Sequence, residues 1–150
     1  MSISSVSNII LALGIFIWFI YRQVRVRQVR DSLLVYIIIL LLGLYMIVSA
    51  VEANKVEFDL KSILICTISF SILAPGFGVI RASVARIWKQ DGIAMCQGSW
   101  ITVILWLVGF GIHNLLDSMF RGSSVTIAAY LAISLLVQRY VVYQRSLRLL

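Results

Sequence analysis

The sequence predicts an all-α fold, a polytopic membrane bundle of five transmembrane helices. Of its 150 residues, 61% are hydrophobic and only 13% are charged, with a mean hydropathy of +1.02. Soluble domains are nearer 45–50% apolar and about 25% charged, so lipid must be part of the solvent of this chain. Five apolar stretches are almost free of charge, and each is about as long as a helix that crosses a bilayer core of about 30 Å. Basic residues gather in every second gap between these stretches.

The first predicted helix, Ile3–Tyr21, ends in aromatic residues that suit the headgroup level of a membrane, Trp18 and Tyr21. Four arginines follow it: Arg22, Arg25, Arg27 and Arg30. One interpretation of this basic tail is an anchor that holds the inner end of the helix. The alternative is a patch that docks lipid headgroups or a partner.

The second predicted helix, Leu33–Val51, is uniformly apolar. The third, Ser62–Ile80, contains Pro75, the only proline of the chain. Proline removes a backbone donor, so we expect a kink near Ser71–Ala74. The hydroxyls of Ser69 and Ser71 are candidates to donate hydrogen bonds to the carbonyls that lose their partners. A broken helix can mark a binding site in transporters, and a kink that only serves packing is the alternative.

Nothing in Val79–Gln90 is a strong helix breaker, so the third helix is expected to continue into the cytoplasm. Asp91-Gly92 is a turn signal, and Ser99 is a plausible N-cap for the fourth helix, Ser99–Leu116. The sequence therefore predicts a helical hairpin with a short cytoplasmic tip. The fifth predicted helix, Ser124–Tyr143, carries small residues for close packing: Ala128, Ala129, Ala132 and Ser134.

Counting charges predicts the orientation. With the N-terminus outside and the C-terminus inside, ten of the thirteen basic residues lie in inside segments, and only Lys55, Lys61 and Arg121 lie outside. Besides the four arginines above, the inside set comprises Arg81, Arg86, Lys89, Arg139, Arg145 and Arg148. We therefore expect residues 1–150 to form one multi-pass domain of the cell inner (plasma) membrane. Four spans, with the first or last helix lying in the interface, is the alternative.

We interpret the net charge of +7 as an adaptation to the anionic headgroups of the inner leaflet and not to binding of nucleic acid. Polar and aromatic residues around the third and fourth helices form the first candidate site, for a ligand or partner. They are Arg81, Arg86, Trp88, Lys89, Asp91, Trp100 and Trp106. Such a set can recognise an anionic headgroup, a phosphate or a partner carboxylate, or it can serve only as inside anchoring. Arg81 needs a partner at the membrane boundary, and Asp31 is a candidate.

The second candidate site, for an ion or proton, comprises His113, Asn114 and Asp117. His113 and Asp117 are four residues apart, so they share a helix face and can meet. Acidic residues of the same outer side can complete the site in a homo-oligomer: Glu52, Glu57 or Asp59. A polar pair at the outer interface is the alternative.

These ligands are too few for zinc, and no metal or cofactor is predicted. Cys66 and Cys96 are expected on opposite sides of the membrane, too far apart for a disulfide, and are interpreted as small apolar fillers.

The segment Gly76–Asp117 resembles the CcdC-like family of small bacterial integral membrane proteins. The residues that carry the resemblance are Gly78, Arg81, Arg86, Asp91, Gly92, Gly98, Trp100, Thr102 and Trp106. The resemblance implies a loose association with cytochrome c maturation genes and no defined activity. One departure is His113, where the family leads us to expect an arginine.

The sequence contains no nucleophile–base pair, phosphate-binding glycine loop or HExxH motif. We therefore expect a non-enzymatic protein, an accessory or assembly subunit of a larger membrane complex. The alternative is a small ion or solute transporter or channel that acts as a homo-oligomer. A membrane enzyme acting on lipids is a third hypothesis, supported only by the basic inner cluster.

Overall fold

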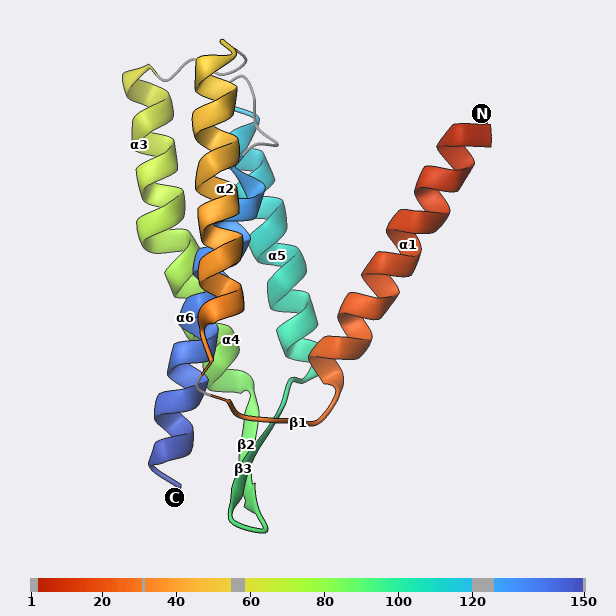
Figure 1. The fold of residues 1–150 in the computed structure, drawn as a ribbon, viewed down its shortest axis with the longest axis vertical. Helices are drawn as coiled ribbons and strands as arrows, with labels where there is room; N and C mark the ends of the chain where they lie inside the picture. The colour runs from red at the N-terminus through yellow and green to blue at the C-terminus, as the bar shows by residue number, and fades with distance from the viewer. Residues whose placement is uncertain (1–2, 31, 55–58, 120–125, 150) are drawn as a thin grey trace.

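The computed structural model describes residues 3–30, 32–54, 59–119 and 126–149. The described chain is mostly helical and also contains a small sheet (Figure 1). Its helices are α1 (Ile3–Val24), α2 (Leu34–Glu52), α3 (Leu60–Ile68), the π-helical turn η1 (Ser69–Leu73), α4 (Ala74–Val84), α5 (Trp100–Asp117) and α6 (Ile127–Leu147). Its strands are β1 (Arg27–Gln28), β2 (Arg86–Gln90) and β3 (Ile93–Gln97). Because α3, η1 and α4 follow one another without interruption, they form one long helix, which makes five in all.

Three of these helices are long and apolar enough to cross a membrane. They are Leu34–Glu52, the continuous helix Leu60–Val84 and Ile127–Leu147. The apolar part of α5, Trp100–Leu116, is shorter. The predicted helical character is confirmed, and the three candidate spans indicate a multi-pass membrane protein, whereas the count of five spans and the sidedness stay predictions.

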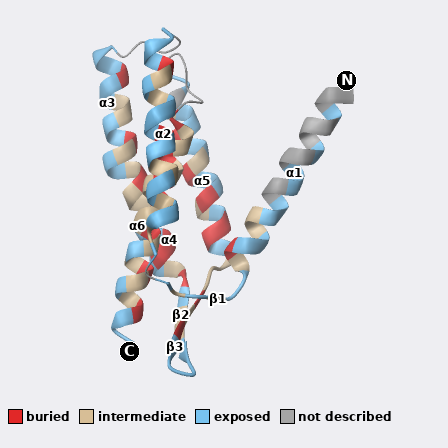
Figure 2. Ribbon diagram, viewed as in Figure 1, coloured by how far each residue is buried: buried red, intermediate tan, exposed pale blue. Residues whose placement is uncertain are grey.

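Helices α4, α5 and α6 form the centre of the bundle, and α2 packs on α6 with most of its surface exposed (Figure 2). Glycines set the closest approaches between helices. A Cβ placed on Gly78 would lie 2.7 Å from the carbonyl oxygen of Ser134, and one on Gly43 would lie 2.6 Å from the Ala129 nitrogen. The predicted close packing of small residues in the last helix is confirmed for Ala129, Ala132 and Ser134, which are fully buried, whereas Ala128 is half-buried.

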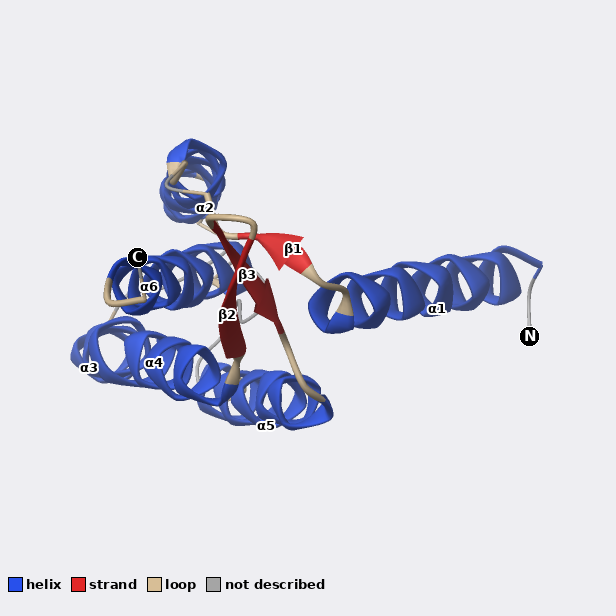
Figure 3. Cartoon of the chain, turned by 90° about the horizontal axis from the view of Figure 1, so that it is seen from below, coloured by secondary structure: helices blue, strands red, loops and turns tan. Residues whose placement is uncertain are grey.

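Helix α1 diverges from the other helices and meets them near its C-terminal end (Figures 1 and 3). There the ring of Phe19 contacts the ring of Trp106 edge to face, with centroids 5.1 Å apart. A Cβ on Gly98 would lie 2.3 Å from the carbonyl oxygen of Gln23, so the chain before α5 passes directly against the end of α1. The base of α1 is therefore fixed to the start of α5.

The predicted helical hairpin is wrong, and so is the all-α class. Helix α4 ends at Val84, and β2 and β3 form an antiparallel β-hairpin in which Trp88 pairs with Met95. Asp91 (φ 51°) and Gly92 (φ 78°) form its two-residue connection. Two consecutive positive φ angles are those of a type I′ turn, which matches the twist of paired strands. The Asp-Gly signal therefore belongs to a β-turn and not to a link between helices.

The tail after α1 is also partly extended, because β1 pairs with β3 to give a three-stranded sheet of order β1-β3-β2. Arg27 pairs with Cys96, and the Val29 amide donates to the Ala94 carbonyl at 2.9 Å. The central strand β3 is thus hydrogen-bonded on both edges. Residues 86–90 therefore form a strand although they contain no strong helix breaker, because pairing with a distant segment stabilises the strand more than local preference stabilises a helix.

The π-helical turn η1 lies where the sequence predicts a kink, and the hydroxyl of Ser69 contacts His113, while the kink itself stays a prediction. The Ala74 amide donates to the Ser69 carbonyl five residues earlier, and Pro75 follows in the first turn of α4, where its missing donor is tolerated. The predicted N-cap of the fourth helix is confirmed. The Ser99 amide donates to the Thr102 hydroxyl at 3.2 Å at the start of α5.

Candidate functional site

Arg81 is the most buried charged residue of the bundle, with 0% of its surface exposed. Its Nη2 donates a hydrogen bond to the hydroxyl of Ser134 on α6. Its guanidinium carbon lies 3.7 Å from the centroid of the Trp106 ring on α5, the geometry of a cation–π contact. One side chain of α4 therefore contacts both other central helices.

No carboxylate among the described residues compensates the charge of Arg81. The one described ionisable group with an electrostatic effect on it is Tyr130. Nε and Nη1 of Arg81 have no hydrogen-bond partner among the described atoms, and neither has Nε1 of Trp106. The ring face of Trp106 and the hydroxyl of Ser134 thus carry most of the compensation. Asp31, the partner suggested by the sequence, lies outside the described residues.

His113 is the centre of a second polar cluster in the same bundle, and its side chain is also 0% exposed. Its Nδ1 lies 2.8 Å from the hydroxyl of Ser69 in η1, and its Nε2 lies 3.3 Å from the hydroxyl of Thr126 before α6. Each hydroxyl can donate or accept, so a neutral imidazole can satisfy both contacts in either tautomer. Both ring nitrogens are therefore held by protein groups.

Tyr130 joins the two clusters. Its ring is stacked on the His113 ring, with centroids 4.2 Å apart and an angle of 12° between the planes. A Cβ on Gly109 would lie 2.9 Å from its hydroxyl, so that glycine makes room for it. Tyr130 also acts electrostatically on Arg81, so it lies near both clusters, and we call this set of polar and aromatic side chains the polar row. It comprises Ser69, Thr126, His113, Tyr130, Trp106, Arg81 and Ser134.

The structure brings together only part of the first predicted site. Arg81 and Trp106 meet in the core, whereas Trp100 is 67% exposed at the start of α5. The remaining members lie on the β-hairpin, where Trp88 is half-buried and three charged residues are exposed: Arg86, Lys89 and Asp91. The seven residues therefore divide into a buried pair, an exposed hairpin group and a separate tryptophan.

The second predicted site is also divided. Asn114 points away from the buried His113, because it is exposed and its side-chain nitrogen donates to the Phe110 carbonyl at 2.9 Å. The side chain of Asp117 lies outside the described part of the chain, and so does Glu57, whereas Glu52 is exposed.

Asp59, another acidic residue that the sequence predicts on the outer side, is the N-cap of α3. It accepts hydrogen bonds from the amide and the hydroxyl of Ser62, at 2.8 Å and 2.6 Å. Those two bonds lower the pKa of the Asp59 carboxyl. The carboxylate is therefore used locally in capping the helix.

Sequence reasoning missed Thr126 and Tyr130, and it interpreted Ser134 only as a small packing residue. A signal was present, because polar residues recur at every fourth position along one face of α6: Thr126, Tyr130, Ser134 and Gln138. All four are buried. Residues four apart share a helix face, so this spacing predicts a polar seam that faces the protein interior.

Arg145 fixes the root of the β-hairpin. Its Nη1 donates to the Ala82 carbonyl and, at 3.2 Å each, to the carbonyls of Ser83 and Ala85. Ala82 and Ser83 carry carbonyls of the last turn of α4, and Ala85 follows the helix. The last carbonyls of a helix have no partner within it, and a cation suits the negative end of a helix dipole. The end of α6 therefore holds the point where the chain leaves α4 and enters β2.

Cys96 lies beside this root in a small core cluster with Ala82, Ala85 and Val142. Burial raises the pKa of its thiol, against the opposing effect of nearby arginines that include Arg27. Its predicted role as a buried filler is confirmed. Cys66 lies on α3 towards the opposite end of the bundle, and these two described cysteines are not joined in a disulfide.

Comparisons of the chain with protein-family models, with curated proteins and with solved structures found no match. The resemblance of Gly76–Asp117 to the CcdC-like family therefore stays a prediction.

Proposed function

We propose that this protein is a non-enzymatic accessory or assembly subunit of a membrane complex, and that it docks its partner through the β-hairpin Arg86–Gln97. The observation that carries the proposal is that this hairpin extends beyond the ends of the helices (Figure 1). It presents exposed side chains of both charges, Arg86, Lys89 and Asp91. The family resemblance points to partners in cytochrome c maturation.

The hairpin is held as a fixed platform. Its central strand is bonded on both edges, its root is held by Arg145, and Ile87 packs against the small core cluster. A preorganised surface loses little conformational freedom on binding, which favours recognition of a protein partner.

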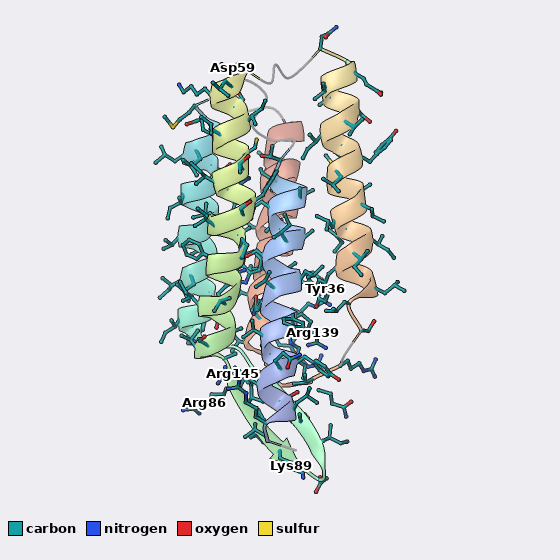
Figure 4. All side chains as sticks on the ribbon, turned by 90° about the vertical axis from the view of Figure 1, so that its left-hand side faces the viewer. Tyr36, Asp59, Arg86, Lys89, Arg139 and Arg145 are labelled. Atoms are coloured by element: carbon teal, nitrogen blue, oxygen red, sulfur yellow. The ribbon has the colours of Figure 1, made fainter. Side chains whose placement is uncertain are left out.

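The distribution of charge supports five crossings, with the N-terminus outside and the C-terminus inside. Figure 4 shows Arg86, Lys89 and Arg145 towards one end of the molecule and Asp59 at the other, with Arg139 between them. Basic residues are concentrated on the cytoplasmic side of membrane proteins, which supports a cytoplasmic location of the hairpin. At 22 and 18 residues, α1 and α5 are within the range of helices that cross a bilayer.

The test is site-specific photocrosslinking of the full chain in native membranes. A photoreactive residue at Lys89, on the hairpin, is compared with one at Lys61, which is exposed near the opposite end. We expect Lys89 to capture one discrete membrane protein that Lys61 does not, and Arg86→Glu to reduce the yield. Adducts only with lipid or with a second copy of this chain at Lys89 would contradict the proposal.

A second candidate function, a small homo-oligomeric transporter or channel, is favoured by the polar row and by η1 beside it. Ionisable groups inside a membrane bundle and π-helical turns are both frequent at functional sites. Purified protein in liposomes would then conduct ions or protons, and His113→Ala or Arg81→Ala would change the flux. Flux equal to that of empty liposomes would reject this candidate.

A further inference from the structure

A cavity of about 440 Å³ opens between the C-terminal end of α1, the start of α2 and the middle of α6. Four arginines line it, from α1, from the β1 segment and from α6: Arg22, Arg27, Arg30 and Arg139. We call it the arginine cleft. It lies apart from the polar row and from the exposed charges of the hairpin.

The described residues that line the arginine cleft are rich in cations. None of the described residues that line it is an aspartate or a glutamate. Nε of Arg139 is buried and has no hydrogen-bond partner among the described atoms, and neither has Oε1 of the neighbouring Gln138. Guanidinium groups held together in this way repel one another, and a bound anion would relieve that repulsion. Guanidinium forks match the oxygen geometry of phosphate.

Part of the polar lining of the cleft comes from α2 and α6. Figure 4 shows Tyr36 and Arg139 close to each other in the middle part of the molecule. The same two residues, with Arg27, also line a smaller adjoining recess. Tyr36 therefore adds a hydroxyl donor next to the guanidinium groups.

The rest of the wall is apolar and aromatic, with Trp18 and Phe19 from α1, Val35 and Ile39 from α2, and Leu135 from α6. These side chains lie on the apolar stretches of the helices, whereas Arg22, Arg27 and Arg30 lie at or beyond the end of α1, and Arg139 is the cation that α6 contributes. An amphiphile with a phosphate at the arginines and a hydrocarbon chain along this wall would satisfy both parts. A soluble anion would use only the first.

We propose that the arginine cleft binds the phosphate group of an anionic phospholipid from the surrounding membrane. The ligand chemistry is a phosphate ester, and the apolar wall favours a lipid over free phosphate as its source. This inference goes beyond the proposed docking role and does not depend on which partner the hairpin binds. A failure of either one leaves the other intact.

The test is native mass spectrometry of the detergent-solubilised full chain, titrated with phosphatidylglycerol and, separately, with phosphatidylcholine. The wild type should retain phosphatidylglycerol more tightly. Arg27→Gln/Arg139→Gln should weaken that binding about tenfold or more, given about 1 kcal/mol for each arginine at an anionic surface. The matched control, Arg25→Gln/Arg148→Gln, removes the same charge from exposed positions outside the cleft and should bind like the wild type.

A second pair of substitutions tests whether a loss of binding comes from misfolding and not from the loss of cleft arginines. Arg22→Gln/Arg30→Gln changes exposed residues at the rim of the cleft, outside the paired strand β1, and should also weaken binding. Equal losses in the cleft variants and in the control would overturn the proposal, because binding would then follow overall charge. Binding of inorganic phosphate alone, with displacement of the lipid at equal concentration, would confirm the phosphate chemistry and overturn the lipid source.

Discussion

The guanidinium carbon of Arg81 lies 3.7 Å from the centre of the Trp106 ring, at a point where Arg81 is fully buried and Trp106 is 3% exposed. This contact joins α4 to α5, and the bond from Arg81 to Ser134 joins α4 to α6. A charge inside the bundle is thus held by a ring face and a hydroxyl. The stability of the three central helices should therefore depend on this arrangement.

Replacing Trp106 should destabilise the bundle strongly. Trp106→Leu removes the ring face and leaves the Arg81 charge buried, with an expected loss of about 2 kcal/mol from the cation–π contact alone. Thermal unfolding in detergent measures the loss. Trp100→Leu is the matched control, because Trp100 is 67% exposed and should change little. Equal unfolding temperatures for the two variants would mean that the contact does not stabilise the fold.

Two serines of the π-helical turn should differ sharply in their sensitivity to substitution. Ser69 is buried and its hydroxyl lies 2.8 Å from His113 Nδ1, whereas Ser71 is exposed. Ser69→Ala should cost about 1–3 kcal/mol, because it leaves a buried polar nitrogen without that partner. Ser71→Ala should be nearly neutral. Chemical denaturation of both variants checks the difference, and a reversed order would contradict the assigned contact.

The turn of the β-hairpin gives a third prediction. Gly92 has φ +78°, which L side chains rarely adopt, so Gly92→Val should destabilise the hairpin. Faster tryptic cleavage after Arg86 and Lys89 would report the opening. Gly111→Val is the control, since a Cβ there meets nothing within 4 Å. If residues 79–90 were helical, Gly92→Val would leave the cleavage rate unchanged.

The Cys96 thiol should be protected in the folded protein. Burial raises the pKa of this thiol, so it stays protonated at neutral pH, and the thiolate is the reactive form. The stability that this group contributes is present below its unfolded pKa and is lost as the pH rises through its higher folded pKa. Alkylation rates measured across alkaline pH should stay low and rise on unfolding. Rapid labelling of folded protein at pH 7 would contradict the burial.

The helices were predictable because their signal is local. Runs such as Leu33–Val51 need only composition, and the resulting α2 begins within one residue of the predicted start. The strand β3 was not predictable in this way, because its stability comes from pairing with both Arg86–Gln90 and Arg27–Gln28. The Asp-Gly pair is the local signal for that hairpin, whereas the absence of helix breakers around it does not by itself stabilise a helix.

The polar row shows the same limit. Arg81 was recognised as needing a partner, but the sequence pointed to Asp31, whereas its contacts are Trp106 and Ser134 on other helices. Which helix faces meet is decided by close glycine contacts such as that of Gly78 with Ser134, which no single stretch encodes. The four-residue spacing along α6 was the one local signal of the row.

The proposed docking role depends most on which side of the membrane the β-hairpin occupies. The decisive measurement is labelling of Lys89→Cys and Lys61→Cys, each in a Cys66→Ala/Cys96→Ala background, with a membrane-impermeant maleimide in intact cells and in opened membranes. We predict that Lys61→Cys reacts in intact cells and that Lys89→Cys reacts only after the membranes are opened. Labelling of Lys89→Cys in intact cells would contradict the cytoplasmic hairpin and the orientation on which its docking role depends.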